Sequence, residues 1–242
     1  MAPAGYGNRV EGLHAVAAAA EAGRVRRLFL ERRRGVTAEL EQIVATVPAT
    51  VVTMVDDIGE VAVTEGSQGV VADCTPIAPV EIGDLALPEA ALLVLDHLED
   101  PYNVGATARS ARAAGMTGMV ISSRRAAPLS ALAFKAAAGA LETLPVAVLS
   151  SIPEAMSRLR DMGVWLVGLS ADAPDSLFGL DLLTEPVAVV IGAEGAGLSR
   201  LAAERCDVLA SIPMAGGTES LNASVSAALA SFEIMRVRQR PG

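Results

Sequence analysis

The most informative segment of the chain is Ser211-Ile-Pro-Met-Ala-Gly-Gly-Thr-Glu-Ser-Leu-Asn-Ala-Ser-Val-Ser-Ala-Ala-Leu-Ala230. It begins at the end of an apolar run, residues 207–212, which reads as a strand ended by Pro213. After two adjacent glycines, apolar residues recur every three or four positions from Leu221, which predicts a helix. Ser220 is the predicted N-cap, because its hydroxyl can accept a bond from a free backbone N–H. Such a junction offers backbone groups to a ligand.

Residues 90–242 alternate strands and helices, which predicts a mostly parallel sheet with helices on both faces. The predicted strands are 91–95, 118–122, 145–149, 164–169, 187–191 and 208–212. The predicted helices are 104–114, 131–138, 152–162, 199–205 and 221–238. The apolar run 187–191 belongs in the middle of this sheet. Ligands of open α/β sheets bind beyond the carboxyl ends of the strands, so the site is expected there.

The first part of the chain reads as a smaller α/β unit. Its predicted helices are 11–23 and 37–45, the second capped by Thr37, and its predicted strands are 25–30, 50–55 and 68–72. Residues 56–63 read as a short helix or turn. Residues 76–89 hold three prolines and show no period, which is typical of a linker. We therefore expect a first domain at 1–75, a linker at 76–89 and a second domain at 90–242.

Composition limits the class of protein. Of the 242 residues, 52% are hydrophobic and only 3% aromatic, and no apolar run reaches the roughly 18 residues of a membrane span. The N-terminus lacks the layout of a signal peptide. Cys74 and Cys206 lie far apart without metal-ligand spacing, which predicts two reduced core cysteines and no metal site. These features favour a cytoplasmic protein.

The charge is unevenly distributed. The formal net charge of −9 argues mildly against a nucleic-acid partner. Residues 1–34, however, carry three acids and seven arginines: Arg9, Arg24, Arg26, Arg27, Arg32, Arg33 and Arg34. Arginine suits phosphate contacts, so all of these except Arg9 are candidates for contacting the phosphates of a nucleic acid. The alternative for the run Arg32–Arg34 is a solvated helix end.

Two further segments fall at predicted strand ends. Residues 95–112 contain Asn103, a predicted helix cap, and Arg109. If Arg109 has only a structural role, we expect it to form a salt bridge to Asp96 or Glu99. Residues 192–199 form a glycine-rich loop around Glu194. The loop lacks the G-x-G-x-x-G spacing, so a nicotinamide oxidoreductase is disfavoured. An acid there suits a ligand with hydroxyl or ammonium groups.

Together the three segments resemble the signature motifs of the SpoU (TrmH-type) RNA ribose 2′-O-methyltransferases of the SPOUT superfamily. The motifs are D-P-x-N-x-G-x-x-x-R-S-A, I-G-x-E-G-x-G-L-S and I-P-M-x-G…S-L-N-x-S-V-x. The resemblance covers roughly residues 90–235. The N-terminal unit is also similar to the L30-like substrate-binding domain of ribosomal-RNA members. A histidine often precedes the Gln-Gly-Val-Val stretch in such members, whereas this chain has Ser67.

The resemblance implies an α/β fold with a deep C-terminal trefoil knot, a homodimer whose interface builds the active site, and S-adenosylmethionine held in the knot. The implied cofactor-binding residues are Gly192, Ile212, Met214 and Leu221. The implied catalytic residues are Asn103, Arg109, Glu194, Ser220 and Asn222. The implied substrate is ribosomal RNA, with a guanosine of the large subunit as the target.

Arg109 raises a chemical question, because a guanidinium with a pKa above about 12 rarely acts as a base. A neighbouring RNA phosphate can share its protons, or Arg109 can stabilise the developing alkoxide electrostatically, which is the smaller claim. Alternatives to the leading hypothesis are the same chemistry on transfer RNA, a resistance enzyme that modifies one ribosomal nucleotide, and a non-catalytic RNA-binding protein.

Overall fold

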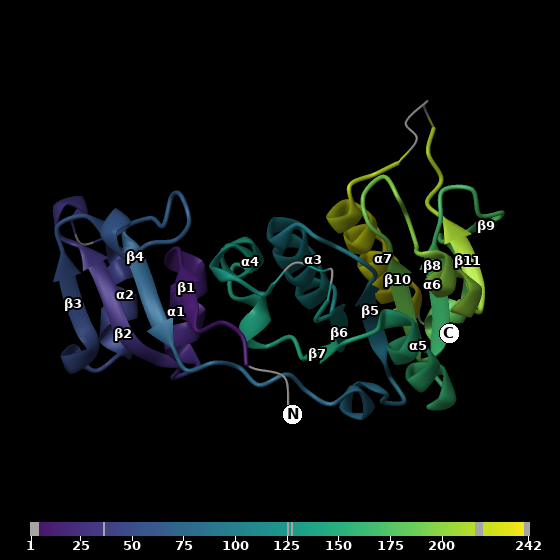
Figure 1. Ribbon diagram of the computed structural model, residues 1–242, viewed down its shortest axis with the longest axis horizontal. Helices are drawn as coiled ribbons and strands as arrows, with labels where there is room; N and C mark the ends of the chain where they lie inside the picture. The colour runs from purple at the N-terminus through teal and green to yellow at the C-terminus, as the bar shows by residue number, and fades with distance from the viewer. Residues whose placement is uncertain (1–4, 36, 125, 127, 216–219, 240–242) are drawn as a thin grey trace.

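The computed structural model describes residues 5–35, 37–124, 126, 128–215 and 220–239. It contains two sheets, one of four strands and one of seven. The small sheet lies at one end of the molecule and the large sheet at the other, with helices α3 and α4 between them (Figure 1). None of the described helices is long and apolar enough to cross a membrane.

The small sheet has the strand order β1-β4-β2-β3. Its strands are β1 (Arg9–Glu11), β2 (Val25–Glu31), β3 (Val52–Val55) and β4 (Val70–Cys74), and only β2 and β3 run parallel. Helices α1 (Leu13–Glu21) and α2 (Ala38–Thr46) complete it, with short 3-10 turns at Arg32–Arg34, Ala49–Val51 and Ile58–Glu60. Thr37 caps α2 as predicted. Strand β1 was missed because its three residues are too few to show a period.

The large sheet has the order β7-β6-β5-β10-β8-β11-β9, and all of its pairings are parallel. Its strands are β5 (Ala91–Leu95), β6 (Gly118–Ser122), β7 (Val146–Leu149), β8 (Trp165–Leu169), β9 (Asp175–Ser176), β10 (Val187–Ile191) and β11 (Val208–Ser211). The central position predicted for residues 187–191 is confirmed, because β10 pairs with β5 on one side and β8 on the other. The two-residue strand β9 was not predicted.

Helices cover both faces of the large sheet. They are α3 (Pro101–Ala113), α4 (Ala131–Ala137), α5 (Ile152–Asp161), α6 (Arg200–Arg205) and α7 (Ala223–Arg238). Alternate side chains of β5 point to opposite faces: Leu93 and Leu95 join the core under α3 and α7, whereas Leu92 and Val94 join the core under α5 and α6. Three 3-10 turns, Ile82–Leu85, Ala140–Glu142 and Asp181–Thr184, lie in the connections, the first inside the predicted linker.

Two predicted helix caps are wrong. Helix α3 begins earlier than expected because Pro101 is already set for the first helical position, and Asp100 accepts the bond from Tyr102 N at 2.9 Å. Asn103 therefore lies inside the helix and is buried. Helix α7 is capped by Asn222 and not by Ser220. The carboxamide oxygen of Asn222 accepts from the backbone nitrogens of Ser224 at 2.8 Å and Val225 at 3.4 Å.

A buried ion pair links the small sheet to the 3-10 turn that follows α4. Arg24, the residue just before β2, donates from Nε to Glu142 Oε2 at 2.7 Å and from Nη2 to Glu142 Oε1 at 2.5 Å. The Arg24 side chain is 12% exposed and that of Glu142 only 2%. Arg24 also donates to the carbonyl of Gly7 and lies over the ring of Phe134. Because the guanidinium donors of Arg24 are used inside the protein, Arg24 is not available to bind RNA, unlike the prediction.

Candidate active site

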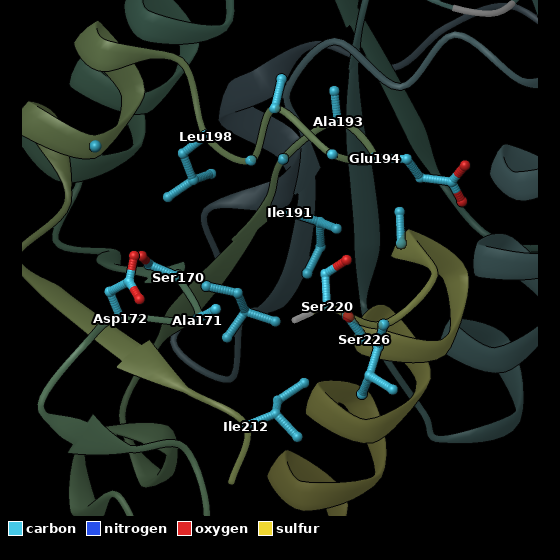
Figure 2. A pocket seen from close by; sticks show the side chains of 18 of the residues that line it. Ser170, Ala171, Asp172, Ile191, Ala193, Glu194, Leu198, Ile212, Ser220 and Ser226 are labelled. Atoms are coloured by element: carbon cyan, nitrogen blue, oxygen red, sulfur yellow. The ribbon is translucent and has the colours of Figure 1, made fainter. Parts of the chain in front are cut away.

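A cleft of about 760 Å³ opens where β8, β10 and β11 end at the carboxyl edge of the large sheet. This is the edge at which α/β sheets bind their ligands. Figure 2 shows Ile191 in the middle of the cleft, with Ser170 and Asp172 on one side and Ser220 and Ser226 on the other. A cleft of this size falls in the range of roughly 300–1,000 Å³ that holds whole small molecules.

The four predicted cofactor-binding residues all line this cleft, and so does Ser220: Gly192, Ile212, Met214 and Leu221 come from the second and third motifs. They lie together because β10 and β11 both end at this edge, which brings the two motifs to one place. Residues 216–219, which join Met214 and Ala215 to Ser220 in sequence, lie outside the described residues.

The glycine-rich loop after β10 folds back on itself. Ala193 and Gly197 form an antiparallel bridge, with Ala193 N donating to Gly197 O at 3.0 Å and Gly197 N donating to Ala193 O at 2.9 Å. A Cβ atom placed on Gly192 would stand 2.1 Å from the carbonyl carbon of Gly197. Only glycine fits at position 192, so this residue lets the loop close tightly against the end of β10.

Three of the predicted catalytic residues form one hydrogen-bonded cluster. Asn103 Nδ2 donates to Glu194 Oε1 at 2.9 Å, and Asn222 Nδ2 donates to the same oxygen at 2.5 Å and to Asn103 Oδ1 at 3.1 Å. Each motif thus contributes one side chain. The cluster joins the first turn of α3 to the glycine-rich loop and the start of α7, and Glu194 also lines the cleft.

Arg109 does not join this cluster. It is exposed on α3 and lines a second cavity of about 230 Å³, which we call the junction hollow. The junction hollow is lined by Glu11, Gly12, His14, Ala15, Gly66, Gln68, Arg109, Lys135 and Ala138. The alternative prediction, a salt bridge from Arg109 to Asp96 or Glu99, is wrong. Arg109 makes no hydrogen bond or ion pair with any described residue. The Asp96 carboxylate instead contacts His97 Nδ1 at 2.6 Å and accepts from Ser199 N at 2.7 Å.

Sequence reasoning missed two polar residues of the cleft, Ser170 and Asp172, which follow β8. The strand itself was predicted, and the carboxyl ends of all parallel strands meet at one edge. What the sequence does not contain is the strand order, which places β8 beside β10 and so brings its end to the cleft.

The remaining predicted RNA-binding arginines lie at the small sheet. Arg26 and Arg27 are exposed on β2; Arg26 Nε donates to Thr75 Oγ1 at 3.0 Å and Arg27 lies over the Phe29 ring. Arg32 pairs with Asp56 at 3.2 Å, with both side chains more than half exposed. Arg33 is exposed, and the side chain of Arg34 is outside the described part of the structure. These groups keep donors that a phosphate can use.

Both cysteines are free thiols, as predicted. Burial raises the pKa of Cys74 to about 11 and that of Cys206 to about 12. Among the described residues no group of three or more histidines, cysteines and acids lies in a position to hold a metal ion.

The family model described as "SpoU rRNA Methylase family" matches residues 90–232. A 23S rRNA (guanosine-2′-O-)-methyltransferase RlmB of Nitrosomonas europaea is 47% identical over 154 residues, covering 63% of this chain and 59% of the relative. An uncharacterized tRNA/rRNA methyltransferase of Synechocystis is 38% identical over 238 residues, covering 94% of this chain and 62% of the relative. The chain thus spans about three fifths of the length of these two relatives.

A solved structure with a similar fold is the SpoU methyltransferase AviRb from Streptomyces viridochromogenes in complex with the cofactor AdoMet. It is 27% identical, covers 95% of this chain and 90% of its own, and has a TM-score of 0.80. The match includes both sheets, because it extends over nearly the whole chain.

Proposed function

The chain belongs to the SpoU rRNA methylase family, and from this we propose that it transfers the methyl group of S-adenosylmethionine to a ribose 2′-hydroxyl of ribosomal RNA. The observation that carries the proposal is the cleft at the carboxyl edge of the large sheet, where residues of all three motifs converge. We place the target at a guanosine of the large-subunit RNA, because several relatives are named 23S rRNA guanosine-2′-O-methyltransferases. We place the protein in the cytoplasm.

The residues of the cleft fit S-adenosylmethionine. The molecule carries a sulfonium and an ammonium group, and the cleft has two acids, Glu194 and Asp172, for positive charge. Apolar side chains such as Ile191 and Leu198 cover the part available to a flat base. When bound, this cofactor supplies an electrophilic methyl group that is already activated by its positive sulfur. We assign its binding to Gly192, Ile212, Met214 and Leu221.

We further propose that the chain is threaded here as a deep trefoil knot. Strand β11 lies between β8 and β9, away from β10. Ile212 and Met214, which follow β11, and Leu221, which precedes α7, all line the cleft. Helix α7 packs against α3 and contacts β5 and β10. Both the loop after β10 and the segment after β11 line the same cleft, which supports the threading.

The remaining work for this chain's own residues is to orient the ribose hydroxyl and to assist its deprotonation. Glu194 accepts hydrogen bonds from both Asn103 and Asn222, so we assign Glu194 to supporting the site. We assign Asn103, Asn222 and Ser220 to positioning the ribose. We assign Arg109 to stabilising the developing alkoxide, because its planar guanidinium has donors that no described residue uses.

Arg109 lines the junction hollow and not the cleft of its own chain, which supports a homodimer in which one protomer's Arg109 serves its partner's cleft. Three large apolar side chains on α3 and α7 are exposed and available for such an interface: Tyr102, Val225 and Phe232. Burying them in a dimer is favourable. We propose that the small sheet and its helices, residues 1–75, are the L30-like domain that binds RNA.

A ribose-methylation map of total RNA from cells with and without the gene tests the proposed function. The proposal expects one 2′-O-methyl site to disappear from large-subunit ribosomal RNA when the gene is deleted. A lost site in transfer RNA would keep the chemistry and overturn the substrate. Absence of S-adenosylmethionine binding by the purified protein would contradict the enzyme itself.

A further inference from the structure

The junction hollow lies between the two parts of the chain. Glu11, His14 and Gln68 reach it from the small sheet and α1, whereas Arg109 and Lys135 reach it from α3 and α4. Its volume of about 230 Å³ is below the roughly 300–1,000 Å³ of sites that hold whole cofactors. A single anionic group fits such a space better than a nucleotide cofactor does.

Three basic side chains surround the hollow. Arg109 has five guanidinium N–H donors, none of them engaged by a described residue. Lys135 is the only lysine in the sequence, and its ammonium group donates to the carbonyl of Glu65, which leaves two of its three donors available. His14 is exposed at the same cavity. In a chain with a formal net charge of −9, basic groups gathered at one cavity are a local exception.

The acid that lines the hollow, Glu11, already accepts hydrogen bonds from the protein. Glu11 is fully buried, and its carboxylate accepts from Val63 N at 2.7 Å and Thr64 N at 3.0 Å, and from the Thr64 hydroxyl. These bonds use both carboxylate oxygens and fix the loop of residues 63–66 on β1. That loop presents the Glu65 carbonyl to Lys135, so Glu11 helps to position the ammonium group.

We infer that the junction hollow binds one phosphodiester of the RNA substrate, through Arg109, Lys135 and His14. This inference rests on the proposed function, and it adds Lys135 and His14 to the residues that meet the substrate. A phosphate in the hollow contacts both parts of the chain at once. It therefore sets the RNA backbone beside Arg109, and binding by the small sheet is coupled to the placement of the target ribose.

The single lysine allows a direct test on the unaltered protein. An amine-reactive acetylating ester modifies only Lys135 and the α-amino terminus, and peptide mass spectrometry reads the two rates separately. Large-subunit ribosomal RNA at a saturating concentration should slow acetylation of Lys135 at least about 10-fold, the size expected for one charged hydrogen-bonded contact. The α-amino terminus serves as the internal control. S-adenosylmethionine alone should leave Lys135 reactive.

An unchanged Lys135 rate while RNA is bound would overturn the inference and leave the proposed function intact. Protection by S-adenosylmethionine alone would overturn the assignment to RNA. Failure of the protein to bind this RNA at all would overturn both, and S-adenosylmethionine binding, measured separately, would then show whether the cofactor site survives.

A pair of variants provides a second test of the phosphodiester site. Lys135→Gln should weaken RNA binding roughly 10-fold and reduce the slope of log affinity against log salt by about 0.7, between about 50 and 200 mM salt. Arg160→Gln removes an exposed charge on α5, which packs on the opposite face of the large sheet from α3, and should change neither quantity. Equal behaviour of the two variants would contradict the inference.

Discussion

Glu142→Gln tests the buried link between the small sheet and the rest of the chain. The substitution keeps the shape of the side chain and removes its charge opposite Arg24. Burial alone would lower the pKa of Arg24, but the hydrogen bonds and the charge of Glu142 outweigh it and raise the pKa. Arginine is not deprotonated in proteins, so Arg24 stays charged in the variant even without the charge of Glu142. Its charge is then left without a counterion, although its side chain is only 12% exposed.

Removing one partner of a buried ion pair costs about 3–5 kcal/mol of folding free energy. We expect the lower end, about 3 kcal/mol, because glutamine retains one acceptor oxygen and Arg24 keeps its bond to the Gly7 carbonyl. For a chain of this size each kcal/mol shifts Tm by roughly 2–4 °C, so Tm should fall by about 6–12 °C. The change should appear in thermal and urea unfolding followed by circular dichroism.

Glu204→Gln is the matched control, since Arg200 and Glu204 form an i,i+4 pair at 2.6 Å with side chains 78% and 53% exposed. Exposed pairs of this kind contribute about 0.3–0.5 kcal/mol, so Tm should change by less than about 2 °C. A Glu142→Gln variant as stable as Glu204→Gln would refute the buried link and return Arg24 to the candidate RNA-binding residues.

Four further predictions concern the cleft and its surroundings. Gly192→Ala should lower S-adenosylmethionine affinity by about 10-fold or more in calorimetry, because the added Cβ meets backbone atoms 2.1 Å away and overpacking costs about 1–3 kcal/mol; unchanged affinity would exclude the loop from the cofactor site. Asn222→Ala should lower the free energy of unfolding by about 1 kcal/mol through loss of the helix cap, whereas Ser220→Ala should not, and the reverse result would restore the cap predicted from sequence. Arg109→Ala should keep S-adenosylmethionine binding and lose most turnover, and normal turnover would remove Arg109 from the mechanism. Burial raises the pKa of Cys206 from 9.0 to about 12. The stability that its protonated thiol contributes is therefore complete below about pH 9 and is lost as pH rises toward 12. Iodoacetamide at pH 8 should label Cys206 far more slowly in the folded chain than in urea, and equal rates would count against its burial.

Much of the second half of the fold was predictable because its strands are long, apolar and separated by amphipathic helices. The predicted bounds of β5, β6 and β10 agree with the structure residue for residue. Short elements were not predictable: β1 and β9 have three and two residues, too few for any period to appear. Their pairing partners, which lie far along the chain, stabilise them.

The site was predictable to the extent that it depends on where strands end. Gly192 and Ile212 follow strands that the apolar pattern reveals, and they meet at the cleft. The positions of Asn103 and Arg109 were harder to predict, because their spacing of six residues separates their directions on a helix by well over a quarter turn. One enters the buried cluster with Glu194, and the other faces the junction hollow.

The role of Arg24 could not be predicted, because the local sequence shows only an arginine just before a strand. Its partner Glu142 is 118 residues away, and only the packing of the small sheet on α4 brings them together. The same packing creates the junction hollow, so its use for RNA could not be inferred before the fold was known.

The central claim is that this chain methylates a ribose of ribosomal RNA, and a transfer assay tests it most directly. Purified protein is incubated with methyl-labelled S-adenosylmethionine and unmodified large-subunit RNA, and the RNA is then hydrolysed with alkali. A 2′-O-methyl group protects the adjacent phosphodiester, so our account predicts label in a single alkali-resistant dinucleotide that begins with guanosine. Label in mononucleotides would show methylation of a base, and an unlabelled RNA would show no transfer; either result would contradict the account.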